Sequence, residues 1–128
     1  MKKLFIAAIM SLSLLTTTAF AEIKMGIILG FTGPIESLTP AMRDSAKLAF
    51  KEASDSGSLL GGEKITVLEA DSTCIDAAAA QAGAEKLISD GVVAIMGADC
   101  SGVTKAIAEN VLFLMVWLWY RHLQHHLR

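Results

Sequence analysis

A continuous apolar run bounded by glycines, residues 92–96, constrains the fold more than any other stretch of this chain. Such a run is typical of a strand that is buried on both faces of a parallel sheet. A short polar loop follows, and from Ser101 onward apolar residues recur at helical spacing: Val103, Ala106, Ile107 and Val111. The stretch therefore predicts a strand, a small-residue loop and a helix N-terminus, which is where an open α/β sheet places a small ligand.

At the predicted helix start, Ser101 has two alternative roles. The first backbone N–H groups of a helix have no partner within it, and they favour a negatively charged group. The Ser101 hydroxyl can cap its own helix, or it can bind a ligand carboxylate beside the N–H groups of Ser101 and Gly102. Position alone favours the cap.

Two more strands and two more helices precede this stretch. The apolar segments 23–29 and 64–70 are predicted strands, and 39–53 and 75–89 are predicted helices. With the helix after Ser101 the order is β-α-β-α-β-α, and each crossover is long enough to be helical. The fold class is therefore α/β, with a doubly wound parallel sheet.

Local signals place the ends and faces of these helices. Thr39 is the predicted N-cap of the first helix and Pro40 its first residue. One stripe of that helix is predicted to be buried: Met42, Ala46, Ala49, Phe50 and Ala53. Residues 71–73 are predicted to form a turn and the N-cap of the second helix, whose many alanines let it lie close to the sheet.

The first 21 residues have the three parts of a secretory signal peptide. Lys2 and Lys3 precede the apolar run 4–15, and Ala19-Phe20-Ala21 is a small-x-small cleavage site. Because the run is too short to span a bilayer, we expect cleavage after Ala21 and no stable membrane anchor afterwards. About a hundred residues remain, enough for one small domain or part of a larger one.

Export determines how the two cysteines are interpreted. In an oxidising compartment Cys74 and Cys100 favour a disulfide over a metal or catalytic pair, with two free thiols as the alternative. The bridge would close a loop of about 25 residues and contribute roughly 3–4 kcal/mol.

Several function classes find no support. The net charge of −2 offers no footprint for nucleic acid. The loop from Gly30 to Pro34 is neither a dinucleotide fingerprint nor a P-loop, and it lacks the acidic residues of a phosphoacceptor domain. Every histidine lies in the last seven residues, so no base accompanies Ser101 or either cysteine. We predict no enzyme, no catalytic residue, no cofactor and no metal.

An ordered set of short motifs resembles the branched-chain amino-acid-binding family of periplasmic solute-binding proteins, which serve ABC importers and have the type I periplasmic-binding-protein fold. The set spans about residues 22–111: Ile23-Lys24, Thr32-Gly33-Pro34, Cys74, Asp90-Gly91-Val92 and Gly97-Ala98-Asp99-Cys100-Ser101. The resemblance implies a partial N-terminal ligand-binding lobe over residues 22–111 and a periplasmic location.

The same resemblance implies roles for individual residues. It pairs Cys74 with Cys100, and it assigns the ligand's α-carboxylate to Ser101, with Gly102 beside it. Leu38 stands about where the family often has an aromatic residue that walls the side-chain pocket. The implied ligand is an amino acid and the implied partner of the full-length protein is an ABC permease. The alternative is the ligand-binding domain of an extracytoplasmic amino-acid or amide sensor.

Residues 112–128 depart from the preceding pattern. They hold both tryptophans, the only tyrosine and all three histidines. His122 and His126 stand one helical turn apart, but a metal site or a membrane hairpin is disfavoured. Permitted codons, read from the last base of the Leu112 codon, can encode a strand followed by Ser-Ala-Thr. We therefore expect a single-base shift here, a truncated lobe with an unpaired strand edge, and weak or absent amino-acid binding.

Overall fold

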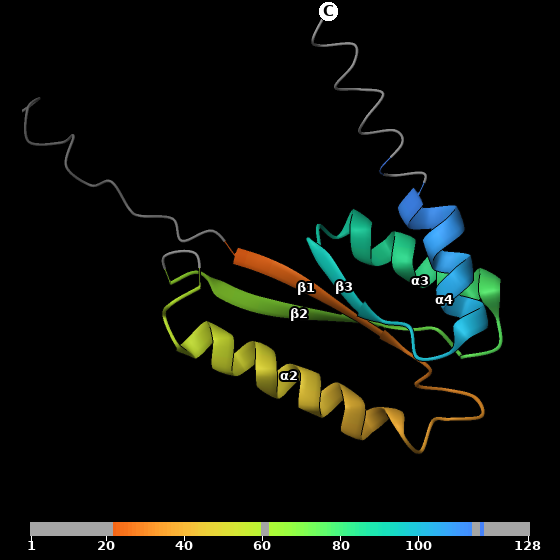
Figure 1. Ribbon diagram of the computed structural model, residues 1–128, viewed down its shortest axis with the longest axis horizontal. Coiled ribbons are helices and arrows are strands. Elements are labelled where there is room, and N and C mark those ends of the chain that lie inside the picture. Colours follow the sequence, from red (N-terminus) through yellow and green to blue (C-terminus); the bar gives the residue numbers. More distant parts are fainter. Residues whose placement is uncertain (1–21, 60–61, 114–115, 117–128) are drawn as a thin grey trace, which may run out of the picture.

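Three parallel strands form the sheet of the chain, seen in a computed structural model that describes residues 22–59, 62–113 and 116 (Figure 1). They are β1 (Glu22–Leu29), β2 (Lys64–Asp71) and β3 (Ala94–Gly97), in the order β2-β1-β3. Between and after them come α2 (Thr39–Asp55), α3 (Ala77–Ser89) and α4 (Ser101–Ile107), and a π-helical turn, η1 (Ala108–Leu112), continues α4. The predicted order of elements and the parallel sheet are confirmed.

The helices lie on both sides of the sheet. Helix α2 covers one face, and α3 and α4 lie together on the other (Figure 1). This arrangement is the doubly wound architecture that the sequence predicts, because right-handed crossovers place successive helices on opposite faces when the strand order changes direction.

The core is built around the central strand. In β1, Ile27 and Ile28 are fully buried, since β1 has a neighbouring strand on each edge and a helix layer on each face. Ile28 belongs to a cluster with buried residues of the helical layer above it: Ala80, Ala84, Leu87, Val103, Ile107 and Val111. Apolar burial of this kind supplies most of the driving force for folding.

Small residues bring α3 close to the sheet, as predicted. A Cβ at Gly83 would lie 3.3 Å from both the Ala70 Cβ and the Ile28 Cδ1. The prediction that residues 71–73 cap this helix is wrong. The cap is Asp76, whose carboxylate accepts the N–H groups of Ala78 and Ala79 at 2.9 and 3.0 Å.

Strand β3, which comes from the apolar run 92–96, is an edge strand of the described sheet. Strand β3 covers only Ala94–Gly97, and Val93 is 72% exposed, so the predicted burial on both faces is wrong. Val93 instead donates its N–H to the Lys24 carbonyl at 2.9 Å as the chain enters the sheet. Among the described residues β3 pairs with β1 alone.

Helix α2 is less buried than its pattern predicts. Met42 and Ala49 are exposed, whereas Ala46, Phe50 and Ala53 are half-buried. The helix packs mainly on β2, so only a narrow strip of its surface meets the sheet. Pro40 is the second residue of the helix, one position later than predicted, because the helix begins at Thr39.

Thr39 does not cap α2. The residue that precedes the helix is Leu38, and no side chain caps this end. The fully buried Thr39 hydroxyl donates instead to the Gly30 carbonyl at 3.1 Å, across the intervening loop. Thr39 therefore stabilises the loop after β1 and does not cap the helix.

Two sequence predictions fall outside the part of the chain that the structure describes: the signal peptide 1–21, and all of the segment 112–128 except residues 112, 113 and 116. Among the described helices, none is both long and apolar enough to cross a bilayer.

Candidate functional site

The loops that follow the three strands come together at the carboxyl edge of the sheet. Because the strands are parallel, the ends at Leu29, Asp71 and Gly97 lie at the same edge. The Ser72 N–H donates to the Leu29 carbonyl at 2.8 Å, so the loop after β2 begins against the end of β1. This edge is where open α/β sheets place ligands.

Asp99 connects all three loops. Its carboxylate accepts the Gly30 N–H at 2.9 Å through Oδ2 and 3.2 Å through Oδ1. The hydroxyl of the buried Ser72 lies 3.4 Å from Oδ1. Hydrogen bonds to an ionised acceptor are stronger than neutral ones, so this carboxylate holds the loop after β3 against the ends of β1 and β2.

A second carboxylate ties the loop after β1 to β2. Asp71 accepts the Thr32 hydroxyl at 2.6 Å and the Thr73 N–H at 2.8 Å. Burial opposes ionisation of Asp71, but the hydrogen bonds from Thr32 and Thr73 outweigh it and hold the pKa of the carboxyl below its ordinary value.

Cys74 and Cys100 are joined in a disulfide, with their Cα atoms 5.3 Å apart. Cys74 and the preceding Thr73 both have positive φ angles, of 68° and 54°, which non-glycine residues rarely adopt. Gly30 lies beneath this turn, where its own Cβ would be 3.2 Å from that of Cys74. The bridge therefore fastens the loop after β2 to the residue immediately before Ser101.

Ser101 is the first residue of α4 and is exposed. The N-cap is Cys100, in an extended conformation and without a capping side chain, so the interpretation of Ser101 as the cap is wrong. The first helical hydrogen bond runs from the Thr104 N–H to the Cys100 carbonyl at 2.9 Å. The N–H groups before it, on Ser101 and Gly102, have no acceptor within the helix.

The other two predicted ligand residues lie at the same edge. Gly102 follows Ser101 and is exposed, and a Cβ there would meet no atom within 4 Å. Leu38 is 61% exposed at the start of α2. Leu38 stands at the N-cap of α2 and Ser101 at the first residue of α4, and these two helices cover opposite faces of the sheet (Figure 1).

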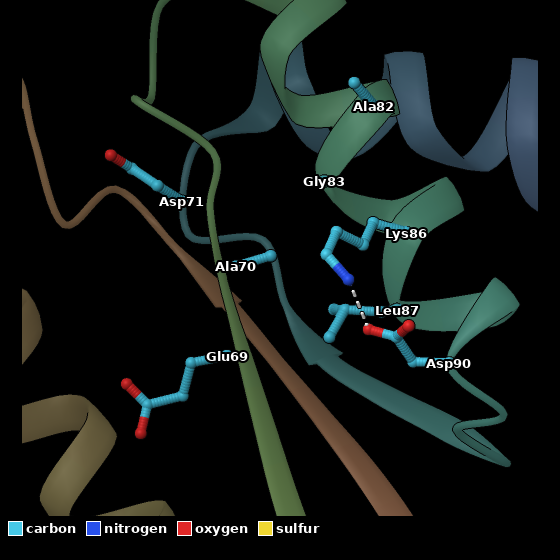
Figure 2. Close-up of a pocket in the computed structure, with 8 residues that line it drawn as sticks. All are labelled: Glu69, Ala70, Asp71, Ala82, Gly83, Lys86, Leu87 and Asp90. Carbon is cyan, nitrogen blue, oxygen red and sulfur yellow. Dashed lines mark hydrogen bonds and ion pairs between the residues drawn. The ribbon is translucent and has the colours of Figure 1, made fainter.

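A groove between β2 and α3 lies apart from these residues. It has a volume of about 380 Å³, and its lining comes from β2, α3 and the end of α3: Glu69, Ala70, Asp71, Ala82, Gly83, Lys86, Leu87 and Asp90. Figure 2 shows Lys86 turned toward Asp90, with which it forms an ion pair of 2.7 Å, and Glu69 pointing away from α3. This groove therefore offers no unpaired charge from Lys86 and does not include the predicted site.

Within residues 22–59, 62–113 and 116, no three His, Cys, Asp or Glu side chains are grouped so that they could hold a metal ion. His122 and His126 lie outside those ranges.

The sequence interpretation missed the residues that build the edge, above all Asp99 and Ser72. A signal for Asp99 was present, because a carboxylate two residues after a strand end stands at the ligand edge of a parallel sheet. Its partner Gly30 could not be recognised from spacing.

Comparison with known proteins gives a consistent result. A family model described as periplasmic binding protein matches residues 22–119 and so extends into the segment 112–128. The Leu/Ile/Val-binding protein BraC3 of Rhizobium johnstonii is 31% identical over 104 residues, which is 76% of this chain and 27% of that protein. The leucine-specific-binding protein of Salmonella typhimurium is 28% identical over 107 residues, covering 84% of this chain and 28% of that protein.

A solved structure shares the fold. The extracellular ligand-binding receptor from Verminephrobacter eiseniae superposes with a TM-score of 0.64 at 24% identity, over 73% of this chain and 26% of that chain. The chain thus spans about a quarter of the length of these relatives.

Proposed function

The chain belongs to the periplasmic binding protein family, and we propose that it forms part of the first lobe of a solute-binding protein for branched-chain or related amino acids. In the same proposal the chain is exported to the periplasm, and the complete protein delivers its ligand to an ABC permease. Support comes from the two amino-acid-binding relatives and from a signal-like N-terminus.

The observation that supports a role for particular residues is that an exposed serine, Ser101, begins α4 at the carboxyl edge of the sheet. In the proposed complex the Ser101 hydroxyl and the N–H groups of Ser101 and Gly102 donate to the ligand's α-carboxylate. The aligned peptide dipoles of the helix add a favourable electrostatic term. Leu38 would contribute an apolar contact on the other side of the edge.

Such a site is one-sided, and we expect it to be weak. Ligand sites in proteins bury most of the ligand between walls that exclude water. The residues described here form a single exposed edge, so the carboxylate keeps much of its hydration and the gain per hydrogen bond stays small. We expect binding in the millimolar range, and calorimetry should detect no micromolar affinity for leucine or other amino acids.

Amide chemical shifts measured during titration with L-leucine test the proposal. The largest shifts are expected at Ser101 and Gly102, and they should shrink in Ser101→Ala. The matched control is Ser45→Ala, which removes an exposed hydroxyl from α2, bonded only to the Ala41 carbonyl. Isopentylamine, which has the side chain of leucine but no carboxylate, should leave these amides unmoved. Equal shifts in the two variants, or none in the parent chain, would refute the assignment.

A further inference from the structure

Asp99 lies where it can determine the position of the proposed ligand-binding residues Ser101 and Gly102. It lies two residues before Ser101, and its carboxylate bonds to the Gly30 N–H and to the Ser72 hydroxyl. Neither partner belongs to α4 or to the loop that leads into it. The carboxylate therefore connects the start of α4 to the ends of β1 and β2.

The partners of Asp99 are themselves fixed. Gly30 donates its N–H to Asp99 and accepts the buried Thr39 hydroxyl on its carbonyl, so both backbone groups of the residue after β1 are engaged. Ser72 is fully buried, and its N–H donates to the Leu29 carbonyl. Asp99 thus bonds to two residues, Gly30 and Ser72, that are themselves held by hydrogen bonds next to the buried core strand β1.

Two further contacts hold the loop on its other side. The Thr104 hydroxyl donates to the carbonyls of Ala98 and Cys100 at 3.0 and 2.9 Å. The disulfide joins Cys100 to the loop after β2. Of all these contacts, only the carboxylate connects the loop directly to the end of the central strand.

We infer that Asp99 is a positioning residue for the ligand edge: its carboxylate sets the placement of Ser101 and Gly102 by fixing their loop to Gly30. The link to ligand binding rests on the proposed function, whereas the positioning itself is a property of the unliganded chain. No contact between Asp99 and the ligand is required.

The test measures amide exchange and chemical shifts in the disulfide-bonded chain without ligand. Asp99→Ala removes both acceptor oxygens, so the Gly30 amide should exchange about tenfold faster or more, and the Ser101 and Gly102 resonances should move. Asp99→Asn keeps one acceptor oxygen and should restore part of the Gly30 protection. If Asp99→Ala does not fold, the Asn variant against the parent chain carries the same comparison.

The matched control is Asp76→Ala, which removes the carboxylate that caps α3. It should loosen the amides of Ala78 and Ala79 and leave Gly30, Ser101 and Gly102 unchanged. Unchanged Gly30 exchange in Asp99→Ala, or equal effects of the two alanine variants on Ser101, would overturn the inference.

Titration of the same variants with L-leucine separates this inference from the proposed function. Weaker leucine-induced shifts in Asp99→Ala than in Asp76→Ala support both. Absence of leucine shifts in the parent chain counts against the proposed function alone, and the ligand-free exchange data then decide the role of Asp99. Leucine shifts of undiminished size in Asp99→Ala would overturn the positioning role.

Discussion

The Thr32 hydroxyl donates to the Asp71 carboxylate at 2.6 Å, and this bond closes the loop after β1 onto the end of β2. The two residues are 39 positions apart in the sequence, yet each lies just beyond or at the end of its strand. The carboxyl edge is therefore held by side chains as well as by the backbone ladder, and its stability can be tested residue by residue.

The Asp71 bond predicts a dependence of stability on pH. The folded-state pKa of Asp71 lies below its ordinary value of 3.8, because the hydrogen bonds from Thr32 and Thr73 outweigh the effect of burial. A carboxyl with a lowered folded pKa stabilises the fold fully above the unfolded pKa, and this contribution is lost as the pH falls through the folded value. Urea unfolding of the parent chain and of Thr32→Val on either side of about pH 4 should show a smaller acid loss in the variant. An identical loss would contradict the prediction.

Gly33 should tolerate alanine poorly. Its φ is +99°, and a Cβ would lie 2.5 Å from the Thr73 carbonyl oxygen. Gly57 is the control, since its φ is also positive, at +67°, but nothing lies within 4 Å of an added Cβ. We expect Gly57→Ala to cost about 1 kcal/mol of unfolding free energy and Gly33→Ala about 2–4 kcal/mol, as the collision adds to the backbone term. Chemical denaturation measures both, and equal losses would show that the loop relaxes freely.

Two leucines on helices separate the core from the surface. Leu87 is 2% exposed in the cluster around Ile28, whereas Leu48 of α2 is 57% exposed. Leu87→Ala should lower the unfolding free energy by about 2–5 kcal/mol because it leaves a cavity. Leu48→Ala should change it by less than about 0.5 kcal/mol. A comparable loss at Leu48 would mean that α2 is covered in solution.

Removing the disulfide should destabilise the chain by roughly 3–4 kcal/mol, since Cys74 and Cys100 are 26 residues apart and the open chain gains conformational entropy. The measurement compares unfolding of the parent chain with that of the double variant Cys74→Ala/Cys100→Ala. Adding a reductant should lower the stability of the parent chain to about that of the double variant and leave the variant unchanged. A reductant effect on the variant would point to a cause other than the bridge.

The N-terminal pattern predicts a defined mature start. Expressed with its first 21 residues, the chain should be recovered from the periplasmic fraction with Glu22 as its first residue, because Ala19-Phe20-Ala21 is the expected cleavage site. N-terminal sequencing or intact mass measures this. Replacing Ala21 with an arginine should block cleavage, and a chain that keeps Met1 without that change would contradict the prediction.

The element order and the parallel sheet could be predicted because they depend on local patterns. The buried Ile27 and Ile28 lie in an apolar run, and the alanines of α3 show directly that the helix can approach the sheet closely. Two cysteines in an exported chain also limit the pairing to one choice. Each of these predictions depends on residue types that can be recognised without knowing which distant residues are in contact, and the structure agrees with them.

Features that depend on distant partners could not be predicted. Val93 lies in the same apolar run as Ile95, but it precedes β3 and is exposed, and the run itself does not distinguish the two residues. Thr39 has the residue type of a cap, yet its hydroxyl donates to the carbonyl of Gly30, nine positions earlier. The position of Asp99 just past a strand end is visible in the sequence, but its partner Gly30, 69 residues earlier, is not.

The Cys74–Cys100 bridge joins loops of two strands that are not neighbours, since β1 lies between β2 and β3. Its native geometry requires both β2 and β3 to be paired with β1, because Cys74 follows β2 and Cys100 follows β3. During oxidative refolding, comparing the time course of thiol loss with that of amide protection in β3 would show whether the bridge forms before or after this strand docks.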